Sequence, residues 1–382
     1  MTPEVRWILA CVGSLGGPHA PPAPDGTLSW DRVLTIAEAE GLAPALGFVV
    51  DAAPPAAMPL AVRARLRQAL TDSTAGQLIL GRELDRLLAA LDREALPAIP
   101  LKGPALAETL YPKPVLRPSS DLDLLVRPET VLGVDGVLHR LGYRRLADDH
   151  SWDFDLAWDR ATLYEGPAGV RVDLHWSLLS EPLYAWDEAE GRAVWERAVT
   201  VPLAGRGALG LCPEDLLLYL TAHLAAHHGL AGLLWYWDLA LLLGRWADRL
   251  DWDAIAARAS RWRVRTAVYF ALLGCQRFFD VSAPGPVMAR LRPRGLRAAA
   301  LRRLLRRYEA DRLKRLEHLI ALLLVDRTRD LIAPLTATLF PSPAWLRARY
   351  EGAGASLLNY YLAHYRRMVA IAGVAVSRTP GT

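Results

Sequence analysis

Residues 99–127 read IPLKGPALAETLYPKPVLRPSSDLDLLVR, and their pattern decides the fold. A short apolar run stops at Lys102–Gly103, and a second apolar run carries Asp121 and Asp123 two residues apart. The first run predicts a strand, PALAETLY predicts a helix with Pro104 in its first turn, and the second run predicts another strand. Because an aspartate in an apolar run is costly to bury alone, the pair indicates a positive group beside it, most simply a metal ion.

A second stretch, ATLYEGPAGVRVDLHWSL (161–178), predicts a hairpin whose second arm alternates strictly. In this arm Arg171, Asp173 and His175 share one face, because side chains two apart in a strand point the same way. The same rule places Asp121 and Asp123 together on one face of their own strand. If the two strands are neighbours, three carboxylates converge on one open face of the sheet.

Three converging carboxylates are typical of a Mg²⁺ site, since hard divalent cations take oxygen ligands and keep positions open for water and phosphate. Such a set can hold two ions about 4 Å apart, which suits phosphoryl-type transfer. Lys102–Gly103, between a strand and a helix start, predicts an anion-binding turn with a compact positive charge. Arg117 and Arg127 flank the aspartates and are further candidates for phosphate contacts.

Each of these patterns has a plainer interpretation. The aspartate pair can be a helix cap plus a charge that protects a strand edge, as we expect for the second D-x-D at Asp153–Asp155. Asp173 can form a surface salt bridge, and Lys102 can be a surface lysine. His175 can support the site, contact substrate or be structural. We prefer the metal site because the three motifs occur together.

Two histidines later in the chain, His223 and His227, have the i, i+4 spacing of a zinc pair on a helix. Leu224 follows the first of them, so the HExxH metalloprotease motif is absent. We expect both to be histidines of the core or of a cleft. The sequence contains no P-loop and no pattern of a hydrolase triad.

Composition is that of a globular protein of 382 residues, with 52% hydrophobic and 23% charged residues. Cys11, Cys212 and Cys275 lie far apart, which argues against a disulfide framework and fits a cytoplasmic protein. No targeting segment is evident, and the very apolar residues 215–244 carry charged and histidine residues, so we expect buried helices and no membrane span there. The net charge is +4, yet residues 290–317 hold ten Arg and one Lys against three acidic residues.

This basic strip, residues 290–317, predicts either a solvated helical surface or a docking surface for phosphate or an acidic partner. It contains a single aromatic residue, so it offers little for stacking nucleic-acid bases, and nucleic acid is weakly supported as a partner. The overall pattern predicts an α+β fold in three parts. These are an N-terminal helical region (1–95), a small mixed-sheet α/β core (96–205) and a large C-terminal helical region (206–382).

The combination of LKGPALAETLYPKPVLRPSSDLDLLVRPE with VDLHWSL resembles the bacterial family of uncharacterised nucleotidyltransferases, within the polymerase-beta-like nucleotidyltransferase superfamily. The resemblance extends to GRELDRLLAALDREALPAIP upstream and to PEDLLLYLTAHLAAHHGLAGLLWYWDLALLL and FPSPAWLRARY downstream. It implies that Asp121, Asp123 and Asp173 bind Mg²⁺, with Asp173 nearest the acceptor and a candidate base. It implies nucleotide or phosphate contacts from the following residues: Lys102, Gly103, Arg117, Ser120 and Arg127. The superfamily's usual Gly-Ser is Lys102–Gly103 here, so the role of that turn is inferred.

The resulting hypothesis is an ATP- or other NTP-dependent transferase that moves an NMP to a hydroxyl or phosphate of an unknown acceptor, a small molecule or a peptide, and releases pyrophosphate. One alternative is the same fold modifying a protein or RNA that docks on the basic strip. Another is a nucleotide-binding protein without catalytic activity. The sequence identifies neither the acceptor nor the nucleotide base.

Overall fold

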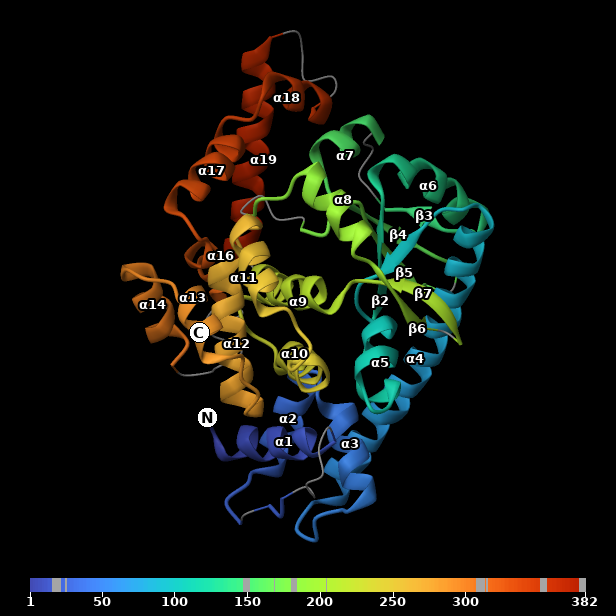
Figure 1. Ribbon diagram of the computed structural model, residues 1–382, viewed down its shortest axis with the longest axis vertical. Helices are drawn as coiled ribbons and strands as arrows, with labels where there is room; N and C mark the ends of the chain where they lie inside the picture. The colour runs from blue at the N-terminus through green and yellow to red at the C-terminus, as the bar shows by residue number, and fades with distance from the viewer. Residues whose placement is uncertain are drawn as a thin grey trace.

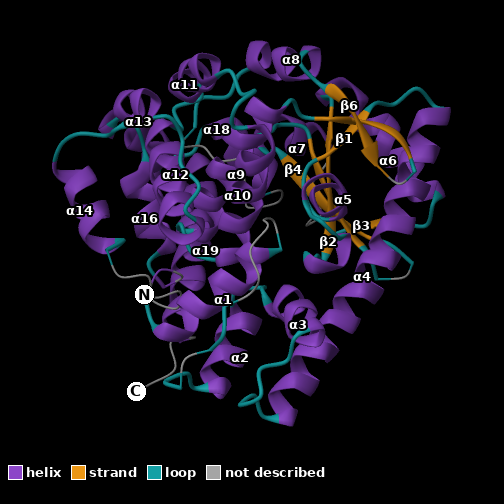
Figure 2. Cartoon of the chain, turned by 60° about the horizontal axis from the view of Figure 1, so that its bottom comes forward, coloured by secondary structure: helices purple, strands orange, loops and turns teal. Residues whose placement is uncertain are grey.

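The computed structural model describes residues 1–15, 22–24, 26–146, 152–167, 169–179, 184–203, 205–306, 313, 315–350 and 356–377. It has the predicted α+β class, with the strands gathered on one side of a largely helical molecule (Figures 1 and 2). Among the described residues, no helix is both long and apolar enough to cross a membrane.

The main sheet has five strands in the order β1-β2-β5-β4-β3. Their bounds are Ala98–Pro100 (β1), Asp121–Val126 (β2), Arg144–Arg145 (β3), Ala161–Glu165 (β4) and Arg171–His175 (β5). β4 and β5 form the predicted antiparallel hairpin, and β2 pairs with β5 in parallel. The two strands that carry the acidic motifs are therefore neighbours, as the convergence of the carboxylates requires.

Short helices and a second hairpin complete this part of the chain. The helices are α5 (Pro104–Leu110), α6 (Val131–Arg140), α7 (Trp152–Trp158) and α8 (Glu188–Glu196), with 3₁₀ turns η1 (Pro114–Leu116) and η2 (Pro128–Thr130). Asp155 of the second D-x-D lies in α7 and pairs with Arg145. The hairpin of β6 (Val199–Leu203) and β7 (Arg206–Gly210) was not predicted, because its apolar alternation covers only the three residues Val199, Val201 and Leu203, and β7 contains two glycines.

Four helices precede the sheet: α1 (Pro3–Ser14), α2 (Trp30–Ala39), α3 (Ala43–Ala52) and α4 (Leu60–Arg93). The 34 residues of α4 make a rod of about 50 Å that runs along the sheet in Figure 1. Its second half buries Leu84, Leu87 and Leu91 at helical spacing against the sheet, so the amphipathic pattern of the sequence explains its position.

The described residues after 212 are mostly helical, as predicted. The helices are α9 (Pro213–His228), α10 (Leu233–Trp246), α11 (Trp252–Arg261), α12 (Arg265–Phe279), α13 (Gly285–Leu291), α14 (Leu296–Leu304), α16 (Glu317–Leu324), α17 (Ile332–Leu339), α18 (Pro343–Arg349) and α19 (Leu357–Ser377), with the 3₁₀ turn η3 (Thr328–Leu331) before α17. The apolar residues 215–244 form most of α9 and α10, which are largely buried.

Two apolar clusters meet at the sheet. One holds Leu122, Leu124 and Val172 of the sheet together with residues of α4 and α6. The other holds Leu125 together with residues of α1–α3 and of α9–α12, so the N-terminal and C-terminal helices share one core. Asp121 and Asp123 alternate with Leu122 and Leu124, and therefore lie on the opposite face of β2 from the first cluster.

The basic strip, residues 290–317, falls on the end of α13, on α14 and on the start of α16. Arg290 pairs with Asp253, and Arg297 donates to the carbonyl oxygen of Asp326 at 3.3 Å. Residues 307–312 and Lys314 lie outside the described residues. Docking on this strip stays a prediction.

Candidate active site

The site is built on the parallel pair of β2 and β5. In this pair Asp121 lies opposite Arg171, Asp123 opposite Asp173 and Leu125 opposite His175. Alternation within each strand and this register together bring Asp121, Asp123 and Asp173 to one face of the sheet. The sequence predicted both faces, and the structure supplies the pairing.

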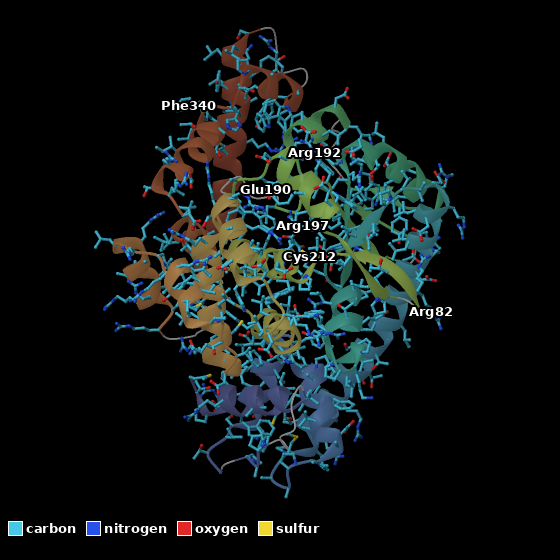
Figure 3. The ribbon with its side chains drawn as sticks, in the orientation of Figure 1. Arg82, Glu190, Arg192, Arg197, Cys212 and Phe340 are labelled. Carbon is cyan, nitrogen blue, oxygen red and sulfur yellow. The ribbon has the colours of Figure 1, made fainter. Side chains whose placement is uncertain are left out.

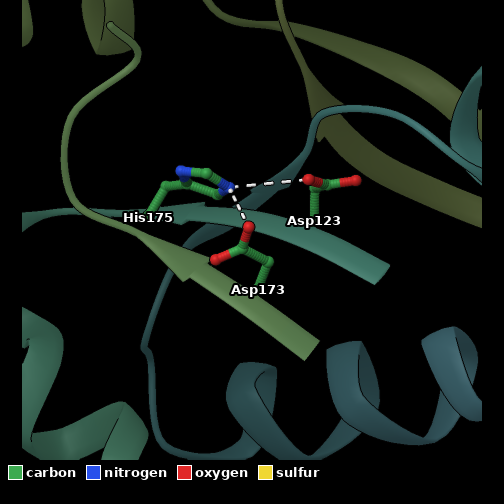
Figure 4. Close-up of side chains that lie close together, drawn as sticks. All are labelled: Asp123, Asp173 and His175. Carbon is green, nitrogen blue, oxygen red and sulfur yellow. Dashed lines mark ion pairs between the residues drawn. The ribbon is translucent and has the colours of Figure 1, made fainter. Parts of the chain in front are cut away.

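Asp123, Asp173 and His175 form a compact cluster, drawn in Figure 4. His175 Nε2 lies 3.5 Å from Asp123 Oδ1 and 3.3 Å from Asp173 Oδ2. One possible ligand atom of each residue lies within 4.8 Å of the other two. The Asp123 side chain is 3% exposed, whereas that of Asp173 is 35% exposed. Asp123 is therefore the buried aspartate of the cluster, and Asp173 is the one that solvent or a ligand can reach.

Burial and the neighbouring charges together set the pKa values of the site. Burial opposes ionisation of Asp123, yet the contact with His175 and the charge of Lys102 outweigh it and lower the pKa of Asp123. Burial likewise opposes protonation of His175, yet the two aspartates raise the pKa of His175 to about 9. For Asp121, burial and the neighbouring charge of Asp123 raise the pKa.

Lys102 is the second cation of the site, beside the protonated His175. Its Nζ lies 2.9 Å from Asp123 Oδ1 and 3.5 Å from His223 Nε2 of α9, and its side chain is 13% exposed. Gly103 has φ 60° and begins α5, and a Cβ there would lie 3.0 Å from the carbonyl oxygen of Asp121. Only glycine adopts this conformation without strain so close to a neighbouring backbone. The Lys102–Gly103 turn thus places the lysine directly beside the aspartates.

The predicted arginines have other partners. Arg117 is 2% exposed and makes a two-pronged ion pair with Asp238, Nε to Oδ1 at 2.8 Å and Nη2 to Oδ2 at 2.9 Å. Its Nη1 donates to Ser119 Oγ at 3.1 Å, so it fixes the turn that leads into β2. Arg127 follows the far end of β2, with Nη1 4.0 Å from Glu129 and its guanidinium over Trp195. The structure brings neither arginine to the acidic cluster.

Ser120 remains beside the cluster, because its Oγ lies 3.4 Å from Asp121 Oδ1. Its hydroxyl can hold the orientation of that carboxylate. A phosphate contact from Ser120 stays a prediction, as do those of Arg117 and Arg127.

A cavity of about 100 Å³ lies between β5 and α9 and opens onto the cluster. Among the described residues its polar lining consists of Lys102, Asp173, His175, Tyr184, Tyr219, His223 and His227. His223 and His227 are thus cleft-lining histidines, in agreement with the sequence interpretation. Burial and the charge of Lys102 hold the pKa of His223 well below its usual range.

Tyr219 was missed by the sequence analysis. The sequence pattern that could have identified it is the spacing of Tyr219, His223 and His227. These residues are four apart and therefore lie along one face of α9. A stripe of polar aromatic residues in an otherwise apolar helix would have indicated the wall of a site.

The oxygen donors of the cluster suit a divalent cation. Asp123 and Asp173 offer carboxylate oxygens at close range, and oxygen is the ligand that Mg²⁺ prefers. A bound imidazole nitrogen would favour a softer metal such as Zn²⁺ or Fe²⁺ over Mg²⁺. The carboxylates therefore fit the predicted metal, whereas His175 fits better as their ion-pairing neighbour.

A family model described as "Uncharacterised nucleotidyltransferase" matches residues 26–280, which include α4, the whole sheet and α9. The solved structure of ANT(2")-Ia in complex with adenylyl-2"-tobramycin is similar at 18% identity and a TM-score of 0.36, over 48% of this chain and 98% of that one. No match to the chain was found among curated proteins.

Proposed function

The chain belongs to the uncharacterised nucleotidyltransferase family, and from that premise we propose that it moves an NMP from an NTP to an acceptor hydroxyl. The observation that carries the proposal is the register of β2 and β5, which sets Asp123 directly opposite Asp173 beside Lys102. In this proposal Asp121, Asp123 and Asp173 hold Mg²⁺. When bound, Mg²⁺ neutralises the charge of the triphosphate and polarises the α-phosphate.

The protein's own groups then have separate roles. The acceptor oxygen forms a bond to the α-phosphorus, the bond from that phosphorus to the bridging oxygen breaks, and pyrophosphate leaves. Asp173, the most exposed of the cluster, accepts the proton of the acceptor hydroxyl. Lys102 moves from Asp123 to the phosphates, a shift that its flexible stem permits. Positioning and charge neutralisation are the main catalytic contributions, as in phosphoryl transfer generally.

The charge count supports this proposal. Among the described residues, Asp121, Asp123 and Asp173 form ion pairs only with Lys102 and a protonated His175. The charge of Arg117 also acts on Asp123, but Arg117 is paired with Asp238, so the face retains negative charge that a cation would balance. A structural ion-pair cluster would be balanced from within, since unpaired buried charge is destabilising.

The test is to measure melting temperature and pyrophosphate release with each of the four NTPs, with and without Mg²⁺. Specific binding raises the melting temperature in proportion to the logarithm of ligand concentration over Kd. We expect a Mg²⁺-dependent increase with at least one NTP, and we expect Asp123→Asn to lose both this increase and pyrophosphate release. Asp153→Asn, an exposed change in the other D-x-D, is the matched control and should behave as wild type.

A wild-type protein that shows neither stabilisation nor pyrophosphate release with any NTP would contradict the proposed function. Binding without pyrophosphate release, even with simple alcohols added, would favour the non-catalytic alternative.

A further inference from the structure

Tyr219 of α9 carries a polar atom that the fold itself does not use. Its side chain is 4% exposed, and its hydroxyl has no hydrogen-bond partner among the residues that the structure describes. Leaving a buried hydroxyl unpaired is destabilising, so such a group calls for a functional explanation. Tyr219 lines the cavity between β5 and α9, in company with Asp173 and Lys102.

Other buried tyrosines of this chain behave differently. Tyr111 donates to Asp238 at 2.6 Å, Tyr164 donates to Asp135 at 2.6 Å, and Tyr236 donates to the carbonyl oxygen of Leu230 at 3.1 Å. At these three positions the fold supplies a hydrogen-bond partner for the buried phenol. Tyr219 departs from this rule at the wall of the candidate active site.

The surroundings of Tyr219 keep its hydroxyl a donor. Burial first, and then the charges of Asp123, Asp173 and Asp121, raise the pKa of Tyr219 well above its usual value. The phenol is thus within electrostatic reach of all three carboxylates and keeps its proton at neutral pH. A protonated phenol in this position can donate to an oxygen atom that enters the cavity.

We propose that Tyr219 binds the acceptor, and that the acceptor is an alcohol whose attacking oxygen receives a hydrogen bond from the Tyr219 hydroxyl while Asp173 accepts its proton. This inference rests on the proposed function. The alcohol oxygen forms its bond to the α-phosphorus, the proton passes to the Asp173 carboxylate, and pyrophosphate departs with the electrons of the broken P–O bond.

The dimensions of the site restrict this alcohol. A cavity of about 100 Å³ admits only a slender hydroxyl-bearing arm. Leu178 also lines a second cavity of about 760 Å³, whose wall includes Trp176, Trp186 and Trp195 near α8. Leu178 therefore forms part of the wall of both cavities.

The experiment compares Tyr219→Phe with Tyr236→Phe, because each change removes one buried hydroxyl from the helical region. Glycerol is the probe, and it competes with water for the NMP of each NTP in the presence of Mg²⁺. The ratio of glycerol adduct to free NMP is measured by mass spectrometry. This ratio cancels effects on NTP binding and on the fraction of folded enzyme, because both products share those steps.

We expect Tyr219→Phe to melt at or above the wild-type temperature and to lower the adduct ratio at least tenfold. Tyr236→Phe should melt at a lower temperature and keep the wild-type ratio, because its hydroxyl has a partner in the fold. An unchanged ratio in Tyr219→Phe overturns the inference. A fall of several degrees in its melting temperature also overturns it, because the hydroxyl would then serve the fold.

The wild-type result separates this inference from the proposed function. Pyrophosphate release with free NMP but no glycerol adduct overturns the alcohol site and leaves nucleotidyl transfer standing. No pyrophosphate release with any NTP contradicts the proposed function, and the inference falls with it.

Discussion

Two aspartate sites in this molecule, Asp215 and the acidic face of β2 and β5, differ in how their charge is satisfied. Asp215 of α9 is 0% exposed, and each of its oxygens has its own guanidinium: Oδ1 pairs with Arg258 at 2.8 Å and Oδ2 with Arg197 at 2.9 Å. Figure 3 labels Arg197, which lies near Cys212 between α8 and α9. This aspartate is balanced within the fold.

The acidic face of β2 and β5 is arranged otherwise. Asp123 receives both Lys102 and His175 on the single oxygen Oδ1, and the hydroxyl of Ser120 lies 3.4 Å from Asp121. Among the described residues, three carboxylates thus share ion pairs with two cations, whereas at Asp215 one carboxylate has two. The contrast teaches that burial alone does not identify a functional acid. The identifying feature is a deficit of positive charge that a metal ion would fill.

The largest expected effect is on the activity of Asp121→Asn. We expect turnover to fall more than a thousandfold, which corresponds to about 4 kcal/mol in the barrier. The melting temperature should stay equal or rise, because the change removes the repulsion between Asp121 and Asp123. Pyrophosphate release and calorimetry measure the two effects. Substantial remaining activity, with the Asp153→Asn control unaffected, would exclude Asp121 from the site.

The reverse is expected for Asp215→Asn. Losing this charge leaves two guanidinium groups without their partner in a buried setting, and we expect a loss of about 3–5 kcal/mol in the free energy of unfolding. Activity per folded molecule should stay near the wild-type value. Urea unfolding measures the first quantity, and specific activity at low temperature measures the second.

Asp51→Asn is the matched control for that experiment. Asp51 also pairs with an arginine, Arg67 at 2.8 Å, but on the surface. Its loss should lower the free energy of unfolding by less than about 1 kcal/mol. If Asp215→Asn and Asp51→Asn lower the free energy of unfolding equally, the proposed difference between a buried and an exposed ion-paired aspartate is wrong.

A smaller effect is expected for Lys102→Met. Removing the ammonium group takes away one of the two cations of Asp123, so the metal-free protein in EDTA should lose about 2 kcal/mol of stability. Mg²⁺ should then bind more tightly, because Lys102 no longer competes for Oδ1, whereas NTP should bind more weakly. Calorimetric titration measures both affinities, and Lys113→Met, at an exposed lysine, is the control. Weaker Mg²⁺ binding in Lys102→Met would contradict this competition.

The last change, Gly103→Ala, should cost about 1–3 kcal/mol of stability. Gly103 has a positive φ, and a Cβ there would also meet the carbonyl oxygen of Asp121 at 3.0 Å. Gly169 has φ 72° but nothing within 4 Å of a Cβ, so Gly169→Ala tests the backbone strain alone. We expect the first change to cost more and also to lower activity, since the clash displaces Asp121. Equal losses of stability in Gly103→Ala and Gly169→Ala would show that the contact between a Cβ at residue 103 and the carbonyl oxygen of Asp121 is unimportant.

The sequence predicted the local features of the site well. Alternation is a property of each strand by itself, so the faces of Asp121, Asp123 and Asp173 could be deduced from neighbouring residues. The parallel pairing of β2 with β5 could only be assumed, because pairing joins distant segments. The β6–β7 hairpin was missed because its apolar alternation is short, three residues in β6, and β7 contains two glycines.

Contacts between distant side chains were beyond prediction. The phosphate role expected for Arg117 came from its closeness to the aspartates in sequence, yet its partner Asp238 lies 121 residues away. Nothing near Arg117 in the chain indicates that pair. Tyr219 was likewise invisible as a single residue, because a tyrosine in an apolar helix is ordinarily a core residue whose hydroxyl finds a partner.

The pairing of β2 with β5 also affects the order in which parts of the chain fold. Residues 127–170 separate these strands, and closing so long a loop is entropically unfavourable until both strands gain their partners. Helices such as α4 form from local contacts and need no such closure. A chain emerging from denaturant will therefore regain most of its helical circular dichroism before Asp123 and Asp173 meet. We therefore expect enzymatic activity to recover later than the helical circular dichroism, because activity requires the contacts that form last.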